Sequence, residues 1–402
     1  MAIQDQRPLA GMRVVDLATM IAAPFCAAML GEFGAEVIKV ELPGSGDPLR
    51  QFGTANGSGS SYNWLNEGRN KKAVTLDVRK PEGAALLKRL LASCDVLVEN
   101  FRPGTLEKWG LDEAALKAAN PRLILVRVSA YGQDGPYKDR PGYARVAHGF
   151  AGLTHLAGEP GGPPVVPGST ALADYISGMY AALGTLLALL ARERHGIAQS
   201  VDVGLYEGIF RMLDELVPVY AATGFVRNRM GADTVNAAPH SHYATSDGRW
   251  VALACTSDKM WERLARVMDR LDLVTPETYA RAERRIAGIQ AVNAIVQDWM
   301  GRHTLQEVLA KCLAGDVPIG PINTVADIFG DPQFAARGNL LRVEHPTAGT
   351  VTVPNTLPRL SETPGRVESL GPALGEHNEE IYGRLLGLTP ADLAALRDKG
   401  LV

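Results

Sequence analysis

The sequence has few of the features that mark the common ligand-binding classes. Its 402 residues contain only four cysteines, Cys26, Cys94, Cys255 and Cys312, and no Cys-x-x-Cys pair. Cysteines scattered in this way argue against a disulfide framework and against a zinc cluster, and they are typical of a reducing compartment. The net charge is only −3, so no excess of positive charge indicates binding to nucleic acid or to an anionic membrane.

Long hydrophobic segments are scarce as well. The first residues, Met-Ala-Ile-Gln-Asp-Gln-Arg-Pro, contain no apolar signal core. The longest apolar stretch, residues 179–191, includes Gly184 and stops at Arg192, so we expect it to be too short to span a bilayer. With 46% hydrophobic and 21% charged residues, the composition predicts a globular, soluble and cytoplasmic protein.

Two nucleotide-binding motifs are missing, although the pattern of an α/β protein is present. Neither Gly-x-Gly-x-x-Gly nor a Walker loop occurs, which argues against NAD(P) and against P-loop nucleotides. Strand-like runs alternate with helix-like runs, which predicts an open parallel sheet with a ligand at its strand ends. The expected strands are 12–17, 36–41, 73–77, 95–99, 123–128 and 199–203, and the expected helices are 22–33, 81–92, 112–120 and 171–194.

The chain is expected to form two domains. The composition changes near residues 227–242, where a smaller α/β domain over 227–325 is inserted into a large Rossmann-like domain. The large domain is then built from both chain ends, 1–226 and 326–402, and the second part contains hairpin-like strands at 340–344 and 350–353. Residues 43–70 are rich in Gly, Ser and Asn and predict a long surface loop.

One carboxylate stands out. The segment Pro167-Gly168-Ser169-Thr170-Ala171-Leu172-Ala173-Asp174 leads into a long apolar helix and places Asp174 at its start. The N-terminal end of a helix carries partial positive charge, so Asp174 is expected to stay ionised there. Its neutral neighbours Ala173 and Tyr175 leave it free to act as a nucleophile. The alternative is a helix cap, the commonest role of an aspartate at such a place.

Several segments together resemble the family III CoA-transferases, which include formyl-CoA:oxalate and carnitine CoA-transferases. The resemblance extends from about Leu9 to about Leu386, nearly the whole chain. The matching segments are 9–17 (LAGMRVVDL), 33–47 (FGAEVIKVELPGSGD), 70–77 (NKKAVTLD), 98–104 (VENFRPG), 315–323 (GDVPIGPIN) and 329–334 (FGDPQF). Each segment alone is weak, but their shared order makes a strong signal.

The resemblance implies a catalytic mechanism. The residue that matches the family's aspartate nucleophile is Asp174, followed by Gly178-Met179 as in oxalate-type members. Its carboxylate would attack an acyl-CoA thioester, pass through a mixed anhydride and become an aspartyl-CoA thioester, which an acceptor acid then reverses. Backbone N–H groups near the helix start are expected to stabilise each oxyanion.

The resemblance also implies the coenzyme A contacts. Met20 and Ile21 match the turn that packs the thiol arm, while the loop from Leu76 to Arg79 and the pair Asn100-Phe101 match the adenine and diphosphate loops. Lys108 and Arg140 match cationic phosphate contacts, although each of these side chains also suits an ordinary core or surface position. Leu42 stands where family members often have Arg, so Lys71, Lys72 or Arg79 is the alternative phosphate contact.

Three histidines are candidates for substrate binding. His148 lies in an apolar helix and is either a core residue or a contact to a substrate carboxylate. His240 and His242 replace the glycine-rich lid loop of the oxalate-type enzyme and are either a substrate contact or a turn without function. No third ligand accompanies them, so no metal is expected.

The sequence thus predicts a CoA-transferase that uses coenzyme A as co-substrate. We expect a donor such as succinyl-CoA and a C4–C5 dicarboxylate acceptor of the succinate, itaconate, mesaconate or citramalate type. A 2-methylacyl-CoA racemase is an alternative, but Tyr143 and Ala144 stand where that branch has its His and Asp. A non-catalytic CoA-binding subunit is another alternative. The resemblance further implies an interlocked homodimer.

Overall fold

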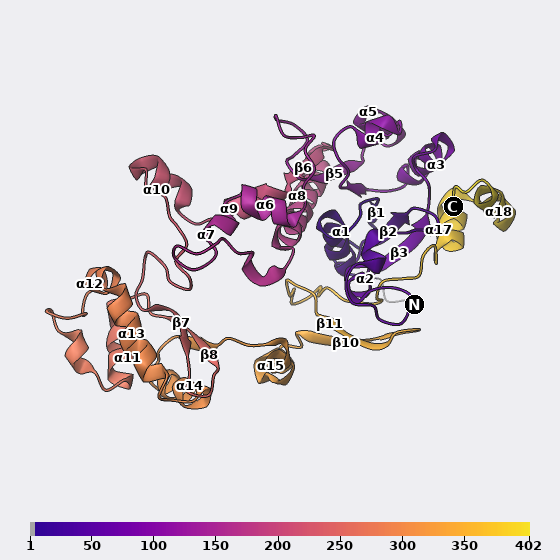
Figure 1. Cartoon of the computed structure of the whole chain (residues 1–402). Coiled ribbons are helices and arrows are strands. Elements are labelled where there is room, and N and C mark those ends of the chain that lie inside the picture. The colour runs from indigo at the N-terminus through magenta and orange to yellow at the C-terminus, as the bar shows by residue number, and fades with distance from the viewer. Residues whose placement is uncertain (1–4) are drawn as a thin grey trace. The chain divides into compact units, whose positions relative to one another are not determined.

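A computed structural model describes residues 5–402 of the chain, with the side chain of Ser169 left out (Figure 1). The contacts divide the chain into two compact units, which are described separately below. The first unit contains Met1–Thr154, Val166–Phe225 and Ala335–Val402, and the second contains His155–Val165 and Val226–Phe334. The domain bounds 1–226, 227–325 and 326–402 stay a prediction about parts that fold independently, because compactness alone does not establish independent folding.

The first unit is organised around a six-stranded parallel sheet, which confirms the predicted α/β fold. Its strands follow the order β3-β2-β1-β4-β5-β6, so the chain direction across the sheet reverses between β1 and β4. In an open parallel sheet, ligands bind at the carboxyl ends of the strands near such a reversal. The strands are β1 (Arg13–Asp16), β2 (Glu36–Glu41), β3 (Lys71–Thr75), β4 (Val96–Glu99), β5 (Ile124–Ser129) and β6 (Ser200–Gly204).

Helices cover both faces of this sheet because its strands are apolar on both sides. Alternating strand residues enter two separate cores, Val14 on one face and Val15 on the other. The first core lies under α1 (Ala22–Glu32), α6 (Ala144–Phe150), α8 (Leu172–His195) and α9 (Leu205–Arg211). The second lies under α3 (Pro81–Leu91), α4 (Thr105–Lys108), α5 (Glu113–Ala119), α17 (Asn378–Leu386) and α18 (Pro390–Asp398).

Helix α8 is the longest element and carries Asp174 in its first turn. Small residues let it approach α1 closely, since a Cβ atom added at Gly178 would lie 2.5 Å from the carbonyl oxygen of Ala22. Its 24 residues make α8 long and apolar enough to cross a membrane, so the expectation of a segment too short to do so was wrong. The expected stretch, 179–191, had left out both helix ends. The buried face of α8 packs on α1 and β5 as a core helix does.

The stretch 43–70, predicted to be one long loop, forms two short helices instead. These are the 3₁₀ helix η1 (Pro48–Gln51) and α2 (Tyr62–Glu67), and both contribute buried side chains. Leu49, Trp64 and Leu65 pack with Val351 and Val353 of the distant hairpin strand β11. Composition alone indicated a loop because these packing partners lie about 300 positions further along the chain.

The predicted hairpin near the C-terminal end is confirmed. It consists of β10 (Leu340–His345) and β11 (Gly349–Pro354), paired antiparallel. The remaining elements of the first unit, with two short ones at its borders, are α7 (Leu153–Leu156), η2 (Pro167–Ser169), α10 (Leu216–Thr223) and α16 (Pro332–Ala336).

The second unit has its own core around Trp261, which is fully buried. Its antiparallel sheet has the order β7-β8-β9, and α13 and α14 pack on that sheet. The elements are β7 (His240–Ala244), β8 (Trp250–Ala254), α11 (Asp258–Val267), η3 (Leu271–Val274), α12 (Ala282–Ala287), α13 (Ile289–Met300), α14 (Leu305–Ala314), β9 (Ile319–Pro321) and α15 (Val325–Gly330).

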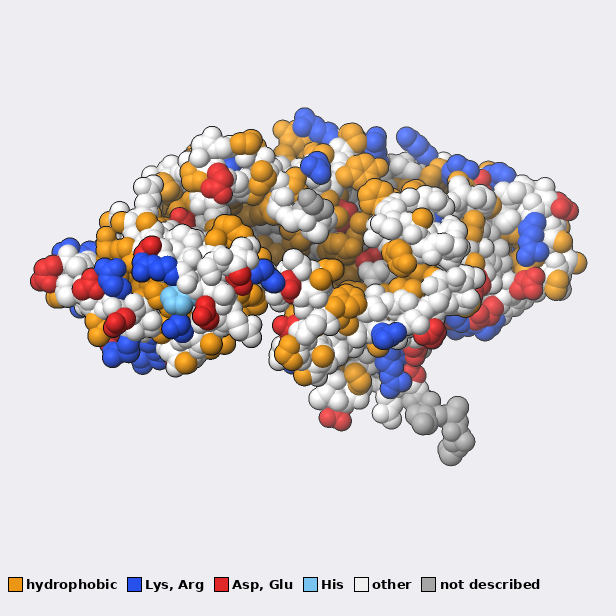
Figure 2. All heavy atoms as spheres, turned by 60° about the horizontal axis from the view of Figure 1, so that its bottom comes forward, with side chains coloured by type: hydrophobic (Ala, Val, Ile, Leu, Met, Phe, Trp, Pro, Cys, Tyr) orange, Lys and Arg blue, Asp and Glu red, His pale blue; other side chains and the backbone are white. Residues whose placement is uncertain are grey.

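Charged side chains of both signs are interspersed over the face of the molecule in Figure 2. Lys and Arg side chains alternate there with Asp and Glu, in keeping with the net charge of −3. A face of one sign, which would attract a polyanion, is not visible on that side.

Candidate active site

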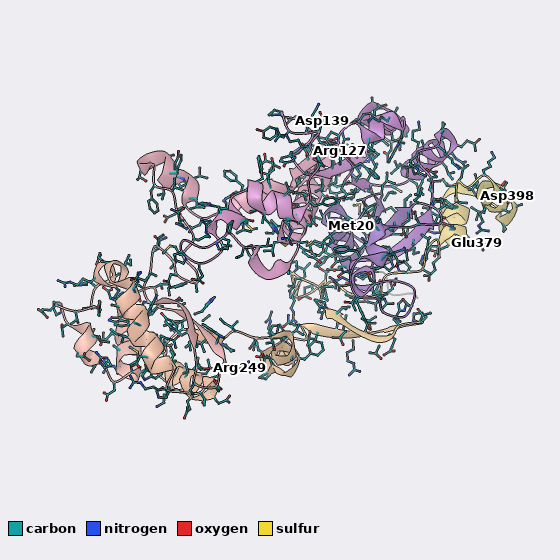
Figure 3. The ribbon with its side chains drawn as sticks, viewed as in Figure 1. Met20, Arg127, Asp139, Arg249, Glu379 and Asp398 are labelled. Atoms are coloured by element: carbon teal, nitrogen blue, oxygen red, sulfur yellow. The ribbon has the colours of Figure 1, made fainter. Side chains whose placement is uncertain are left out.

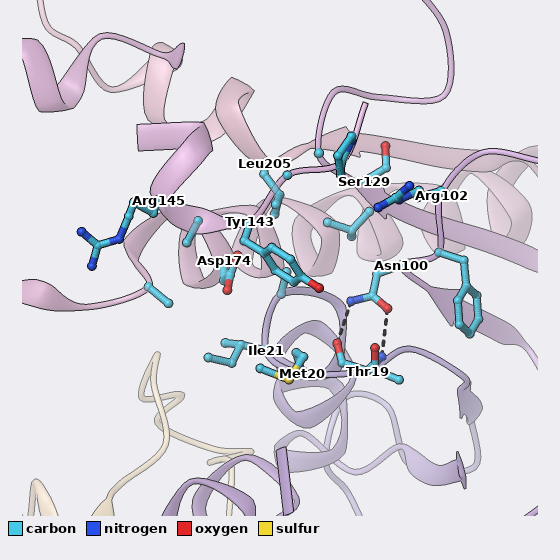
Figure 4. Close-up of a pocket in the computed structure, with 18 of the residues that line it drawn as sticks. Thr19, Met20, Ile21, Asn100, Arg102, Ser129, Tyr143, Arg145, Asp174 and Leu205 are labelled. Atoms are coloured by element: carbon cyan, nitrogen blue, oxygen red, sulfur yellow. Dashed lines mark hydrogen bonds between the residues drawn. The ribbon is translucent and has the colours of Figure 1, made fainter. Parts of the chain in front are cut away.

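The first unit contains a cavity of about 580 Å³ at the carboxyl ends of its central strands (Figure 4). The loops after β1 and β4, the end of β5 and the first turn of α8 all contribute to its walls. Met20, Ile21, Asn100, Phe101, Arg140 and Asp174, six of the residues predicted from the sequence, line this one cavity. Their convergence from distant segments follows from the strand order, which brings these loops together at one edge of the sheet.

The turn after β1 is held in an uncommon conformation. Met20 has a left-handed backbone with φ of 65°, and its N–H donates a hydrogen bond of 3.0 Å to Asp47 Oδ1. The N–H of Thr19 donates to Asn100 Oδ1 at 2.9 Å, and Asn100 Nδ2 donates back to the Thr19 carbonyl at 2.7 Å (Figure 4). Figure 3 shows Met20 beside the sheet of the first unit. Asn100, predicted as a ligand contact, therefore also fixes the shape of the turn.

Buried ion pairs hold the turn between β1 and α1 in place. Lys39 is almost fully buried, and its Nζ lies 2.9 Å from Asp47 Oδ2 and 3.5 Å from Asp16 Oδ1. Lys71 Nζ lies 2.9 Å from Asp16 Oδ2 and donates to the Pro24 carbonyl at 2.7 Å. The β1–α1 turn is thus held on a network of ion pairs. Sequence reasoning missed this network, since no local pattern pairs residues so far apart.

The ion pairs also narrow the search for a phosphate contact. Lys71 is buried against Asp16, and Lys72 pairs with Glu36 and Glu380. Both lysines begin β3, at the amino end of that strand, although Nζ of Lys71 reaches Asp16 at the carboxyl end of β1. Both ammonium groups thus already have carboxylate partners, and the suggestion that either one replaces the missing arginine stays a prediction. Arg79 follows the carboxyl end of β3, with Nε 2.7 Å from Asp77 Oδ1, and it remains a candidate.

Asp174 is the third residue of α8, and its helix begins after Ala171 as the N-cap. No side chain caps this helix start, so the capping interpretation of Asp174 was wrong. Within residues 5–402 its carboxylate forms no ion pair, and burial raises its pKa to about 6. A carboxylate with this pKa is mainly ionised at pH 7 and is a better nucleophile than a fully hydrated one.

Both neighbours of Asp174 are anchored to other elements. The N–H of Ala173 donates a hydrogen bond of 2.9 Å to Nε2 of His148, which lies on α6 and is 1% exposed. The hydroxyl of Tyr175 donates to Glu67 Oε1 of α2 at 3.1 Å. Asp174 is therefore held between two fixed residues. The N–H of Ala173, being bonded to His148, is not free to serve as the predicted oxyanion donor.

Four cationic side chains line the cavity, namely Arg102, Lys138, Arg140 and Arg145, and Asp174 is the one carboxylate in its described lining. The guanidinium of Arg140 stacks on the Tyr137 ring, with Cζ 3.6 Å from the ring centroid. Such a cavity favours an anionic ligand. Lys108 lies on the exposed side of α4 and does not belong to this lining.

A second cavity of about 270 Å³ lies beside the first and shares Thr19, Pro48 and Phe101 with it. Leu76 and Arg79 line this second cavity, together with Trp109, whose ring packs edge-on against Phe101 at 5.0 Å. The predicted contact residues therefore fall into two adjoining spaces. An elongated anionic ligand can occupy both.

Comparison with known proteins identifies the family of the chain. The family model for CoA-transferase family III matches residues 9–378. The chain belongs to CoA-transferase family III.

Two curated relatives and one solved structure illustrate how far the similarity extends. The alpha subunit of succinyl-CoA–L-malate CoA-transferase from Chloroflexus aurantiacus is 49% identical, over 99% of this chain and 94% of the relative. The beta subunit named for the same activity in that organism is 51% identical, over 98% of both chains. A CAIB/BAIF family protein from Brucella suis is 35% identical with a TM-score of 0.84, over 94% of this chain and 99% of the other.

In this family III CoA-transferase, the three histidines predicted to bind the substrate are not among the residues that line the cavity of Asp174. His240 and His242 belong to strand β7 of the second unit, where a loop or turn was expected. Residues two apart on a strand point to one face, so the two imidazoles lie on the same side of the sheet. Their contact with substrate stays a prediction, and so does that of His148, which lies behind the cavity lining.

The racemase alternative and the expectation of no metal can both be compared with the structure. Tyr143 and Ala144 line the cavity where a racemase would need an acid–base pair, and an alanine cannot move a proton. Within residues 5–402, no group of three His, Cys, Asp or Glu side chains is placed to hold a metal ion.

Proposed function

We propose that this CoA-transferase moves coenzyme A from succinyl-CoA to a C4–C5 dicarboxylic acid of the succinate, malate, itaconate, mesaconate or citramalate type. The observation that carries the proposal is Asp174, the one carboxylate in the described lining of a cavity that four cationic side chains border. The names of the two curated relatives, which include succinyl-CoA and L-malate, support this donor and a C4 acceptor.

In the first half of the proposed reaction, Asp174 becomes a CoA thioester. A carboxylate oxygen of Asp174 attacks the thioester carbonyl carbon, the C–S bond breaks, and CoA leaves as a thiolate. The thiolate then attacks the aspartyl carbonyl of the mixed anhydride, which releases the donor acid as a carboxylate. No proton has to be transferred in either step, and Asp174 ends as an aspartyl-CoA thioester.

The second half runs the same steps in reverse with the acceptor. A carboxylate of the acceptor acid attacks the aspartyl thioester and displaces CoA thiolate, which forms a new mixed anhydride. The thiolate attacks the acceptor carbonyl, which yields the new acyl-CoA and restores Asp174. Backbone N–H groups of the first turn other than that of Ala173 are proposed to stabilise the oxyanions.

The adjoining cavities support a binding mode for coenzyme A. Met20, Ile21 and Asn100 are proposed to contact the thiol arm beside Asp174, while Leu76, Arg79 and Phe101 hold the nucleotide end in the second cavity. Arg140 is proposed as a phosphate contact, with Lys108 at the rim. His148, His240 and His242 remain the proposed contacts for the acid.

We further propose that the active form is a cytoplasmic homodimer. Exposed leucines along α8 support an assembly, and the four cysteines are unpaired and buried, as suits a reducing compartment. The relatives are named as alpha and beta subunits, so a mixed pair of chains is the alternative assembly.

The test replaces the nucleophile. Asp174→Ala and Asp174→Asn are expected to lower transfer from succinyl-CoA by several powers of ten with little change in CoA affinity. Asp398→Asn, an exposed aspartate of α18, is the matched control. Hydroxylamine is expected to trap the aspartyl-CoA thioester in the wild type only. More than about a tenth of wild-type turnover in Asp174→Ala would refute Asp174 as nucleophile.

The same preparation separates the alternatives. If the chain were a non-catalytic subunit, the purified wild type would form no trapped ester. If it were a racemase, solvent deuterium would enter the α-carbon of a 2-methylacyl-CoA without any transfer of CoA.

A further inference from the structure

Arg145 is a cation of the cavity whose position suits the acid rather than coenzyme A. It lies in the first turn of α6, lines the cavity with Asp174, and is exposed. Within residues 5–402 its guanidinium has no ion-pair or hydrogen-bond partner. We infer that Arg145 binds the second carboxylate of the dicarboxylic acid and so determines the acid specificity. This inference rests on the proposed function and names a residue for it.

The period of helix α6 fixes where Arg145 points. Ala144, Ala147 and His148 are buried in the core of the first unit, so the side chain of Arg145 lies on the outer side of the helix. Ala144 and Arg145 are consecutive in the cavity lining, which places the guanidinium stem at the cavity wall.

The arrangement of the cations separates two functions. In Figure 4, Arg102 and Asn100 lie on one side of Asp174 and Arg145 lies on the other. The side of Arg102 and Asn100 continues through Phe101 into the second cavity, where the nucleotide end of coenzyme A is proposed to bind. In the proposed binding mode, an acyl group attached at Asp174 extends away from coenzyme A, to the side on which Arg145 lies.

The chemistry of the cavity requires a cation on that side. A dicarboxylate brings a second negative charge close to Asp174, and like charges in a partly buried site repel strongly. A guanidinium can balance this charge by donating two parallel hydrogen bonds to the carboxylate. His148 cannot supply the charge, because burial and the nearby charge of Arg145 lower its pKa.

The experiment compares two acids that differ only in the second carboxylate. Labelled succinate exchanging into succinyl-CoA, and labelled butyrate exchanging into butyryl-CoA, each use a single acid on both halves of the reaction. Arg145→Met is expected to lower kcat/KM for the succinate exchange by roughly 10- to 100-fold relative to the butyrate exchange. Arg145→Lys, which keeps the charge without the planar fork, is expected to lose less. Arg194→Met removes a charge of the same kind about 30 Å from Asp174, near the other end of α8, and is expected to leave the ratio unchanged.

Each outcome has a defined meaning. A ratio that Arg145→Met leaves unchanged, or an equal loss for both acids, overturns the assignment, and an equal loss would indicate that Arg145 binds coenzyme A. If the wild type exchanges succinate but the ratio does not move, only the assignment of Arg145 fails. If the wild type exchanges neither acid, the proposed function fails together with it.

Discussion

Nε2 of His148 accepts a hydrogen bond of 2.9 Å from the backbone N–H of Ala173, the residue directly before Asp174. An imidazole nitrogen that accepts a hydrogen bond carries no proton, so His148 is neutral here. Because His148 is 1% exposed, this bond fixes the first turn of α8 from inside the core. The histidine that the sequence suggested as a substrate contact is thus also in a position to orient the proposed nucleophile.

This bond predicts the effects of two substitutions at His148. His148→Phe leaves the Ala173 N–H buried without a partner, which costs about 1–3 kcal/mol of the free energy of unfolding. If this hydrogen bond is the whole role of His148, we expect a lower kcat, an almost unchanged KM for acyl-CoA and an unchanged preference among acids. His148→Gln offers a carbonyl oxygen to the same N–H and is expected to recover part of the kcat. Chemical denaturation and steady-state kinetics on the three proteins measure these effects.

A direct contact between His148 and the substrate predicts another result. In that case His148→Phe would weaken dicarboxylates by on the order of tenfold relative to monocarboxylates of the same length. His240→Ala and His242→Ala provide the matched comparison, because both lie on β7 of the second unit. If only these two variants change the ratio, His148 has the backbone role alone.

The raised pKa of Asp174 predicts how the rate depends on pH. Burial raises this pKa to about 6, and only the ionised carboxylate attacks the thioester. We expect kcat/KM for succinyl-CoA to be level near pH 7 and to fall about tenfold per pH unit well below pH 6. The 3′-phosphate of coenzyme A titrates in the same range, so succinyl-dephospho-CoA is the control substrate. A rate that stays level down to about pH 4.5 with both substrates would contradict the assignment.

The raised pKa of Asp174 also predicts how the stability of the fold depends on pH. The sign is opposite to that of a carboxyl group whose pKa is lowered by folding. An aspartate whose pKa is higher in the folded state than in the unfolded state favours the fold when protonated. Its contribution is present below about pH 4 and is lost as the pH rises through about 6. Asp174→Asn is therefore expected to be more stable than the wild type at pH 7, by up to about 3 kcal/mol, and no more stable below about pH 4. Thermal unfolding at the two pH values measures the difference.

Much of the fold could be predicted because the residues of each strand are enough to identify it. Runs such as Val-Ile-Lys-Val in β2 are apolar enough to identify a buried strand without any partner, and the six strands of the parallel sheet were all found this way. The two helices within residues 43–70 could not be predicted in this way. Trp64 and Leu65 acquire their structural role only through contacts with β11 at the other end of the chain.

The residues of the site also divide into those that the sequence could predict and those that it could not. Asp174, Met20 and Asn100 could be predicted because each belongs to a segment with a family pattern, and the structure places all three in one cavity. Arg145 and the Lys39–Asp47 ion pair could not be predicted. One is an isolated surface-type residue in the sequence, and the other depends on the sheet and the turn being formed first.

Phosphate binding gives a prediction that separates Arg140 from Lys108. Arg140 lines the cavity and is held over Tyr137, whereas Lys108 lies outside the lining. Arg140→Ala is expected to raise KM for succinyl-CoA by on the order of tenfold with little change in kcat, because a remote phosphate is bound equally in ground and transition states. Lys108→Ala is expected to have a smaller effect. Tyr137→Leu, which removes the stacking ring, should resemble Arg140→Ala; a larger effect of Lys108→Ala would reverse the two assignments.

The last prediction concerns the assembly of the chain. Leu183, Leu186, Leu187 and Leu190 are all exposed, with Leu187 57% exposed, and they recur at helical spacing on one face of α8. A continuous apolar stripe on the surface is costly in water, so we expect a second chain to cover it. Light scattering coupled to gel filtration should give the mass of two chains. Leu187→Glu places a charge in the stripe and is expected to yield monomers with reduced transfer, whereas Leu313→Glu, an equally exposed leucine of α14, is the control. An active monomer would contradict the expected homodimer. A wild type that becomes active only with a second, different polypeptide would instead indicate the paired arrangement for which the relatives are named.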